Sequence, residues 1–247
     1  MPGIKHPEWF ECWFDSPYYH ILYKNRDNSE AELFIDKLIQ LLQPVKANRF
    51  LDLGCGKGRH SIYLNKKGID VTGIDLSEKS IAYAKLSENA HLHFYRHDMR
   101  KLFRTNYFDV VMNLFTSFGY FEQERDDNAT INAIYKALKP SGIVILDFFN
   151  SKKIMQYLPY NEAKNIEGID FKISKTLDNN FIVKHIEFID KGKNYHFLER
   201  VKALTLSDFE KYFEANKLKI VHLRGNYNLD EFDELSSDRL IIVAEKQ

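Results

Sequence analysis

The sequence predicts an α/β fold in which helices cover both faces of a mainly parallel sheet. Short apolar runs alternate with helix-like stretches between residues 29 and 149. A glycine-rich turn, LDLGCGKG, follows the first of these apolar runs at residues 51–58, and two more apolar runs close the chain. Strands that alternate with helices are typical of such sheets. At 247 residues the chain can bury the core of one domain that carries a small insert.

The first predicted element is a helix over residues 29–42. One face of this helix carries Leu33, Phe34, Leu38, Leu41 and Leu42. Ser29 is expected to cap its N-terminus, and Pro44 to end it. We therefore expect residues 1–43 to form an N-terminal helical cap within a single domain of residues 1–247.

Strands joined by helices follow this cap. The apolar runs lie at residues 49–55, 70–77, 92–99, 108–115 and 142–149. Helices are expected at residues 59–67, from the Ser77 cap to Lys85, and at 126–138, where Pro140-Ser141-Gly142 ends the last of them. Near the C-terminus, Ser207 and Glu210 have the spacing of a capping box, and residues 219–225 and 239–246 supply the last two strands.

Residues 165–204 break the alternation of strands and helices. Apolar runs at 171–177, 181–189 and 195–204 are separated by turns so short that the strands must be antiparallel. Roughly forty residues in three strands are too few to hold a core alone. The insert leaves the sheet after the fifth strand, at the carboxyl edge where open α/β sheets bind ligands. We expect it to be a lid over a pocket.

Composition narrows the class of partner. Lys and Arg together number 35, as do Asp and Glu, so the formal net charge is zero. A neutral chain has no global field that would draw it to nucleic acid or to an anionic membrane. No apolar run approaches the roughly 18 residues of a membrane span. Because Cys12 and Cys55 are expected to be reduced thiols, we expect a cytoplasmic protein. We expect a monomer or homodimer with no membrane partner, and the neutral charge makes a nucleic-acid partner unfavoured.

The glycine turn and two acidic residues predict an adenosine site. Gly54, Gly56 and Gly58 have the spacing G-x-G-x-G, and bare backbone of this kind lets a ligand approach closely. The dinucleotide fingerprint instead requires G-x-G-x-x-G, so a nicotinamide-dependent oxidoreductase is the less favoured alternative. Asp75 lies 21 residues after Gly54, at a strand end where it would accept the ribose hydroxyls. Asp98 ends the next strand and would face adenine.

Together these motifs resemble the class I S-adenosylmethionine-dependent methyltransferases of the small-molecule type. LDLGCGKG is similar to their first motif, GIDLS to the second and HDM to the adenine-contacting segment. FDVVMNLF resembles their fourth strand, and LKPSGIVILDF their fifth, with Ser141 in place of a glycine. The resemblance implies a Rossmann-like seven-stranded sheet of order 3-2-1-4-5-7-6 with the last strand antiparallel, S-adenosylmethionine as cofactor and S-adenosylhomocysteine as product. The implied cofactor-binding residues are Asp52 (below the amino group), Gly54, Cys55, Gly56, Gly58, Asp75, Leu76, Asp98, Met99 and Asn113.

The chemistry of methyl transfer sets few demands on side chains. It is an in-line displacement on an activated donor, so the protein mainly aligns the reactants and excludes water. The Asn-Pro-Pro-Tyr type of motif is absent, because the segment after the fourth strand reads NLFTSF. Asn113 opens that segment and is either catalytic or a polar residue satisfied at a strand end. The aromatic residues nearby, Phe115, Phe118, Tyr120 and Phe121, line the pocket or belong to the core.

Residues 13–27 form an aromatic leader before the first long helix. Exposing so much aromatic surface is unfavourable, so the leader either staples that helix to the sheet or closes over the cofactor. Small-molecule methyltransferases, including the tellurite-resistance type, carry a similar Tyr-x-x-Arg leader whose basic residue meets the methionine carboxylate. The resemblance therefore places Tyr23 and Arg26 in the cofactor site. Tyr19 and His20 would line the acceptor site as catalytic residues, with His20 a candidate base.

The acceptor is expected to be a small molecule. The sequence leaves open an RNA or protein acceptor, and also an adenosine-binding protein without turnover. His91, His93 and His97 alternate along a strand, but no set of cysteines or carboxylates completes a metal site beside them. No metal is therefore expected.

Overall fold

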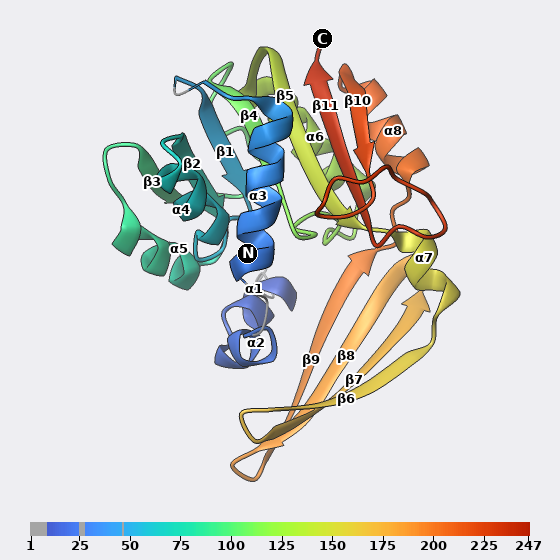
Figure 1. Ribbon diagram of the computed structural model, residues 1–247. Coiled ribbons are helices and arrows are strands. Elements are labelled where there is room, and N and C mark those ends of the chain that lie inside the picture. Colours follow the sequence, from blue (N-terminus) through green and yellow to red (C-terminus); the bar gives the residue numbers. More distant parts are fainter. Residues whose placement is uncertain (1–8, 25–27, 46) are drawn as a thin grey trace, which may run out of the picture.

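The computed structural model describes residues 9–24, 28–45 and 47–247 (Figure 1). Its helices are α1 (Trp9–Phe14), α2 (Pro17–Leu22), α3 (Asn28–Leu42), α4 (Arg59–Lys66), α5 (Glu78–Ala84), the short η1 (Lys85–Ser87), α6 (Glu124–Ala137), α7 (Ser151–Gln156) and α8 (Leu206–Ala215). Its strands are β1 (Arg49–Leu53), β2 (Asp70–Asp75), β3 (Leu92–Arg96), β4 (Phe108–Asn113), β5 (Leu138–Phe149), β6 (Tyr160–Ile166), β7 (Ile169–Asp178), β8 (Phe181–Asp190), β9 (Lys193–Lys202), β10 (Leu218–Arg224) and β11 (Arg239–Lys246). None of the described helices is long and apolar enough to cross a membrane.

The main sheet has seven strands in the order β10-β11-β5-β4-β1-β2-β3. Strands β1 to β5 are paired in parallel, while β11 runs antiparallel to both of its neighbours, β5 and β10. Since β10 and β11 are the sixth and seventh strands of this sheet along the chain, the predicted order 3-2-1-4-5-7-6 is confirmed. The carboxyl ends of β1, β2 and β4 consequently meet at one edge.

Helices cover both faces of this sheet, as the alternating pattern predicts. One buried cluster joins the sheet to α3, α4 and α5, through residues such as Phe34, Leu64 and Ile81. A second cluster joins the opposite face to α6 and α8, through residues such as Ile134 and Phe209. Figure 1 shows these two helical layers on either side of the strands.

Two helix starts differ from expectation. Helix α3 begins at Asn28, so Ser29 lies inside it, and Leu33 is 47% exposed although it was expected on the buried face. Helix α8 begins with a capping box made by Thr205 and Asp208, two residues before the expected pair. The spacing of the two residues was right, but propensity does not fix which of several Ser, Thr and Asp residues takes the extended cap conformation.

The insert is larger than its apolar runs predict. It is a four-stranded antiparallel sheet of order β6-β7-β8-β9 over residues 160–202, not three strands over 165–204. Strand β6 has the sequence YNEAKNI, in which most residues are exposed or half-buried. It therefore lacks the apolar signal that marks a strand in a sequence. In Figure 1 this sheet extends away from the carboxyl edge of the main sheet.

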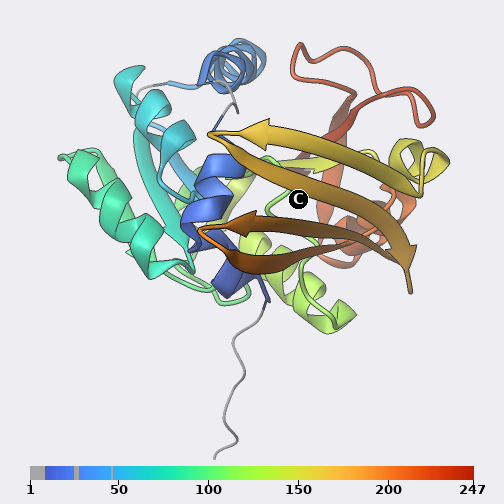
Figure 2. The ribbon, with the colours of Figure 1, turned by 90° about the horizontal axis from the view of Figure 1, so that it is seen from below.

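The leader forms helices α1 and α2, which pack on the inserted sheet. Trp13 and Leu22 share a buried cluster with residues of that sheet, among them Phe171 and Ile186. The Trp13 ring lies 4.5 Å from the ring of Phe197, centroid to centroid. Figure 2 shows the leader helices (dark blue) beside the inserted sheet. The leader thus packs on the insert, a contact that the sequence did not predict.

Candidate active site

A cavity of about 1050 Å³ lies at the carboxyl ends of β1, β2 and β4. The edge of the main sheet with its adjoining helices, the leader helices and the inserted sheet supply most of its lining. The contributions of the leader are Trp9, Phe10, Phe14, Tyr19, His20, Tyr23 and Lys24. The inserted sheet contributes Glu162, Lys164, Lys175, Ile182, Lys184, Glu199 and Val201. The two segments that interrupt the α/β pattern therefore form two walls of this cavity.

The glycine turn forms part of the cavity floor. Gly54 and Gly56 both have positive φ angles, 73° and 54°, which favour glycine. Nothing lies within 4 Å of the position that a Cβ of Gly56 would occupy, so the backbone there faces open space. At Gly54 a Cβ would lie 2.8 Å from the Cβ of Ser117. The turn thus leaves room for a ligand above Gly56. Cys55, which is buried with its thiol pKa raised by burial, also lines this part.

Asp75 lies next to the turn at the end of β2. Its Oδ2 accepts a hydrogen bond from the Gly56 N–H (2.9 Å), and its Oδ1 accepts one from the Ser77 N–H (2.8 Å). Each carboxylate oxygen has two lone pairs, so each can accept a further bond from a ligand hydroxyl. Burial raises the pKa of Asp75, and the two backbone donors act against that rise. Leu76, the next residue, also lines the cavity.

Asp52 is the most deeply buried acid of the cavity. It is 1% exposed, and its Oδ2 accepts a hydrogen bond from Ser61 Oγ (2.6 Å). Burial raises the pKa of Asp52 to about 6, while the Ser61 bond and the nearby Arg59 guanidinium favour the ionised form. A buried carboxylate of this kind is a strong partner for a ligand cation.

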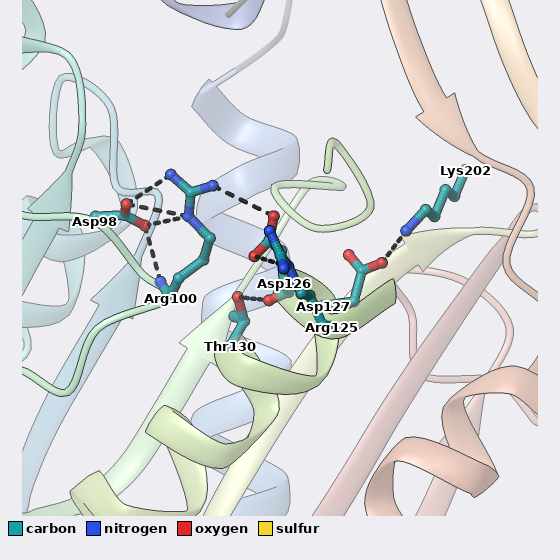
Figure 3. Close-up of polar contacts among 7 residues, drawn as sticks. All are labelled: Asp98, Arg100, Arg125, Asp126, Asp127, Thr130 and Lys202. Carbon is teal, nitrogen blue, oxygen red and sulfur yellow. Dashed lines mark hydrogen bonds and ion pairs between the residues drawn. The ribbon is translucent and has the colours of Figure 1, made fainter. Parts of the chain in front are cut away.

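Asp98 already has a partner within the protein. Both of its oxygens accept hydrogen bonds from the Arg100 guanidinium, at 2.7 to 3.1 Å (Figure 3). Burial alone would raise the pKa of Asp98, but the hydrogen bonds from Arg100 outweigh it and hold this pKa below its usual range. Arg100 also lies 3.6 Å from Asp126 of α6. Asp98 and Met99 line the cavity as expected, with the Asp98 carboxylate shared with Arg100.

Gly58 and Asn113 lie below the cavity and are not among its lining residues. A Cβ on Gly58 would lie 2.6 Å from the ring of Phe94, so this glycine allows α4 to pack on the sheet. The Asn113 amide is fully buried and its Nδ2 donates to the Leu53 carbonyl (3.0 Å). The binding role expected for Gly58 and the catalytic and binding roles expected for Asn113 stay predictions, which the described lining of the cavity does not support. Spacing in a sequence does not distinguish a residue that faces a ligand from one that packs beneath it.

The leader residues that the sequence singled out mostly face the cavity. Tyr19, His20 and Tyr23 line it, whereas Arg26 lies outside the described residues. Burial, together with the nearby Lys57, lowers the pKa of His20. The Tyr23 hydroxyl donates to Glu199 of β9 (2.5 Å). A side chain of the leader and one of the insert are thus joined at the cavity wall.

A strained loop follows β4, and only its aromatic character could be predicted from the sequence. Phe115 and Thr116 have φ angles of 54° and 61°, which are uncommon outside glycine. The fully buried Asp147 holds this loop by accepting from the Phe115 N–H (2.7 Å), and Arg239 forms an ion pair with the same carboxylate (2.7 Å). The Phe115 ring stacks on Tyr227 with centroids 4.9 Å apart. These residues lie far apart in the sequence and carry no shared motif.

The aromatic residues that follow β4 are divided between the cavity and the core. Phe115, Tyr120 and Phe121 line the cavity, whereas Phe118 belongs to the buried core. His97 lines the cavity, and its Nε2 lies 2.9 Å from the Lys101 carbonyl oxygen. Within the described ranges, no three His, Cys, Asp or Glu side chains are grouped so that they could hold a metal ion.

Comparisons with known proteins point in one direction. A protein family described as "Methyltransferase domain" matches residues 50–142. A protein of Geobacillus sp. (strain WCH70), named as a methyltransferase, is 30% identical over 252 residues, covering 97% of this chain and 99% of its own. The dTDP-3-amino-3,4,6-trideoxy-alpha-D-glucopyranose N,N-dimethyltransferase of Streptomyces venezuelae is 24% identical, over 84% of this chain and 91% of its own. Among solved structures, an S-adenosylmethionine-dependent methyltransferase from Clostridium acetobutylicum ATCC 824 is similar with a TM-score of 0.78 and 19% identity, over 93% of this chain and 96% of that one.

Proposed function

Because this chain belongs to the class I S-adenosylmethionine-dependent methyltransferase family, we propose that it methylates a small-molecule acceptor bound beneath the leader and the insert. The observation that carries the proposal is the cavity itself. Its floor holds the acids and glycines suited to the cofactor, while its walls come from segments outside the sheet.

The residues of the floor fit the cofactor. Asp75 has free lone pairs for the ribose hydroxyls, and the open space above Gly56 admits a ligand against the backbone. Asp52, a buried carboxylate that lines the cavity, would pair with the methionine ammonium group. When bound, the cofactor supplies a methyl group that is already activated by its sulfonium. The protein then has to bind the acceptor in line with that group and keep water out.

The walls are suited to those two tasks. The leader brings Tyr19 and His20 to the cavity, and the insert is held to the leader by an apolar cluster and by the Tyr23–Glu199 hydrogen bond. We propose that leader and insert act as one lid. Burial keeps His20 neutral near pH 7, so it can accept a proton from an acceptor that binds protonated.

The name of one relative indicates nitrogen as the atom that accepts the methyl group. The Streptomyces venezuelae relative is named for N,N-dimethylation of a dTDP-linked amino sugar, and it matches most of this chain. An amine needs only to reach the methyl group in its neutral form, so it requires no catalytic group beyond a base such as His20. A macromolecular acceptor is less favoured because leader and insert both wall the cavity.

Calorimetric titration with S-adenosylmethionine, S-adenosylhomocysteine, NAD and NADP tests the cofactor. We expect binding of the first two only, and binding of a nicotinamide alone would overturn the proposal. A metabolite screen scored by S-adenosylhomocysteine release then tests the acceptor. Amines of low molecular mass should give turnover, whereas turnover only with RNA or protein would show that the lid admits larger substrates.

A further inference from the structure

The inner face of the inserted sheet is divided into two parts. One part is apolar and lies under α1 and α2, in the cluster that includes Phe171, Ile186 and Phe188. The other part is charged and lines the cavity through Glu162, Lys164, Lys175, Lys184 and Glu199. Charged side chains on the inner face of a lid need a reason, since apolar residues would cover the cavity with less loss of hydration.

Lys175 and Lys184 lie directly opposite each other on β7 and β8. Directly opposed residues of an antiparallel pair have Cβ atoms about 5 Å apart, and like charges there are destabilising. Both side chains line the same cavity. An anion between them would turn this repulsion into attraction.

The other charges of this face already have partners. Lys164 forms an ion pair with Glu162 (2.9 Å), and Lys184 lies 3.7 Å from Glu199 and donates to the Tyr23 hydroxyl. Lys175 lies over the Tyr160 ring, 5.1 Å from its centroid, and forms no ion pair within 4 Å among the described residues. With three lysines against two glutamates, the cavity face of the insert therefore carries one excess positive charge, at Lys175.

We propose that Lys175 and Lys184 form a binding site for an anionic group, a carboxylate or a phosphate, on the acceptor. Lysine ammonium groups bind either anion as point charges. The proposal rests on the proposed methyltransferase function and names its substrate class: a small amine that also carries an acidic group. The acidic group of the acceptor would be bound by the two lysines of the insert, while its amine nitrogen is methylated beside the glycine turn. The lid would thereby select the substrate that it encloses.

The first test measures anion binding without turnover. Thermal unfolding is followed with malonate or inorganic pyrophosphate, against sodium chloride of equal ionic strength, with and without S-adenosylhomocysteine. We expect at least one anion to raise the melting temperature of the wild type, and Lys175→Met and Lys184→Met to abolish the shift. Lys172→Met is the matched control, because Lys172 is exposed and lies on the opposite face of β7. No shift in the wild type, or equal shifts in all four proteins, would overturn the proposal.

The second test uses turnover to separate the two anions. Amino acids, their neutral amides and aminoalkyl phosphates are compared as acceptors by S-adenosylhomocysteine release. We expect one acidic series to exceed the amides at least tenfold in kcat/KM, and the two inner-face variants to raise KM for that series about tenfold with cofactor affinity unchanged. Equal rates with amides would refute the anion site while leaving methyl transfer intact. Failure to bind either form of the cofactor would instead refute the proposed function.

Discussion

Gly56 donates its backbone N–H to Oδ2 of Asp75 over 2.9 Å, which ties the glycine turn after β1 to the carboxylate at the end of β2. The same carboxylate also holds the Ser77 N–H at the start of α5. Asp75 therefore holds the glycine turn against the start of α5, in addition to its proposed contact with the ribose. A substitution of Asp75 should therefore affect both the conformation of the glycine turn and the binding of the cofactor.

Asp75→Ala should weaken S-adenosylhomocysteine binding at least thirtyfold, or about 2 kcal/mol, because two ribose hydroxyls lose a charged acceptor. Calorimetric titration measures this loss of affinity. Thermal unfolding of the cofactor-free protein shows how far the loss of the Gly56 and Ser77 hydrogen bonds destabilises the turn itself. Asp70→Ala is a suitable control, since Asp70 begins the same strand at its opposite end. An unchanged affinity in Asp75→Ala would remove this residue from the site.

Asp52 should make cofactor affinity depend on pH. Burial raises its pKa to about 6, and only the ionised form pairs with the methionine ammonium group. The dissociation constant should therefore rise as pH falls through 6, by about tenfold between pH 7.5 and pH 5. Asp52→Asn should bind weakly at every pH and lose most of this slope. Parallel slopes in the two proteins would show that another group, such as Asp75, is responsible.

Gly58→Ala should impair folding and leave binding intact. Its φ of 82° costs an alanine about 1 kcal/mol, and the added Cβ would lie 2.6 Å from the Phe94 ring. Gly68→Ala separates the two effects, because Gly68 has a φ of 90° but nothing within 4 Å of its Cβ position. In urea titrations Gly58→Ala should lose clearly more stability than Gly68→Ala. A loss of cofactor affinity in the folded variant would return Gly58 to the binding site.

The pair formed by Asp127 of α6 and Lys202 of β9 should anchor the insert (Figure 3). Both side chains are buried, and burial raises the pKa of Asp127 to about 6. Lys202→Met would leave a buried carboxylate unpaired, so we expect a loss of about 3 kcal/mol in the free energy of unfolding at pH 8. The loss should shrink at pH 5.5, because the folded state then takes up a proton on Asp127 before the unfolded state does. Adding Asp127→Leu should restore most of the stability, and a double variant no better than Lys202→Met would argue against this account.

The cofactor half of the site could be predicted from the sequence because it is built from short continuous motifs at strand ends. Asp52, Gly56 and Asp75 owe their positions to β1 and β2, whose apolar runs fix both strand and register. The same reasoning did not anticipate that Asn113 lies in the layer below the cavity, since a shift of one residue at a strand end decides between the two. Spacing alone does not carry that information.

The acceptor half could not be predicted in this way. Strand β6 is polar, and its pairing with β7 rather than its composition makes it a strand. Lys175 and Lys184 lie on the same face of β7 and β8 as the apolar residues Ile173 and Ile186, and only the packing of the leader decides which part of that face is covered and which part lines the cavity. Such long-range packing leaves no local pattern in the sequence.

Leader and insert meet at one shared hydrogen-bond acceptor, Glu199. The Tyr23 hydroxyl and the Trp13 Nε1–H both donate to Oε1 of Glu199, at 2.5 and 2.7 Å. If leader and insert close over the acceptor as one lid, Tyr23→Phe should loosen the lid without exposing apolar surface. We expect kcat to fall about tenfold, with the affinity for S-adenosylhomocysteine changed less than threefold, because one charge-assisted hydrogen bond is worth roughly 1.5 kcal/mol. Tyr19→Phe is the matched comparison: it also lines the cavity and should slow transfer only if its hydroxyl contacts the acceptor. Wild-type turnover in Tyr23→Phe at unchanged stability would show that the leader supports the insert without taking part in the reaction.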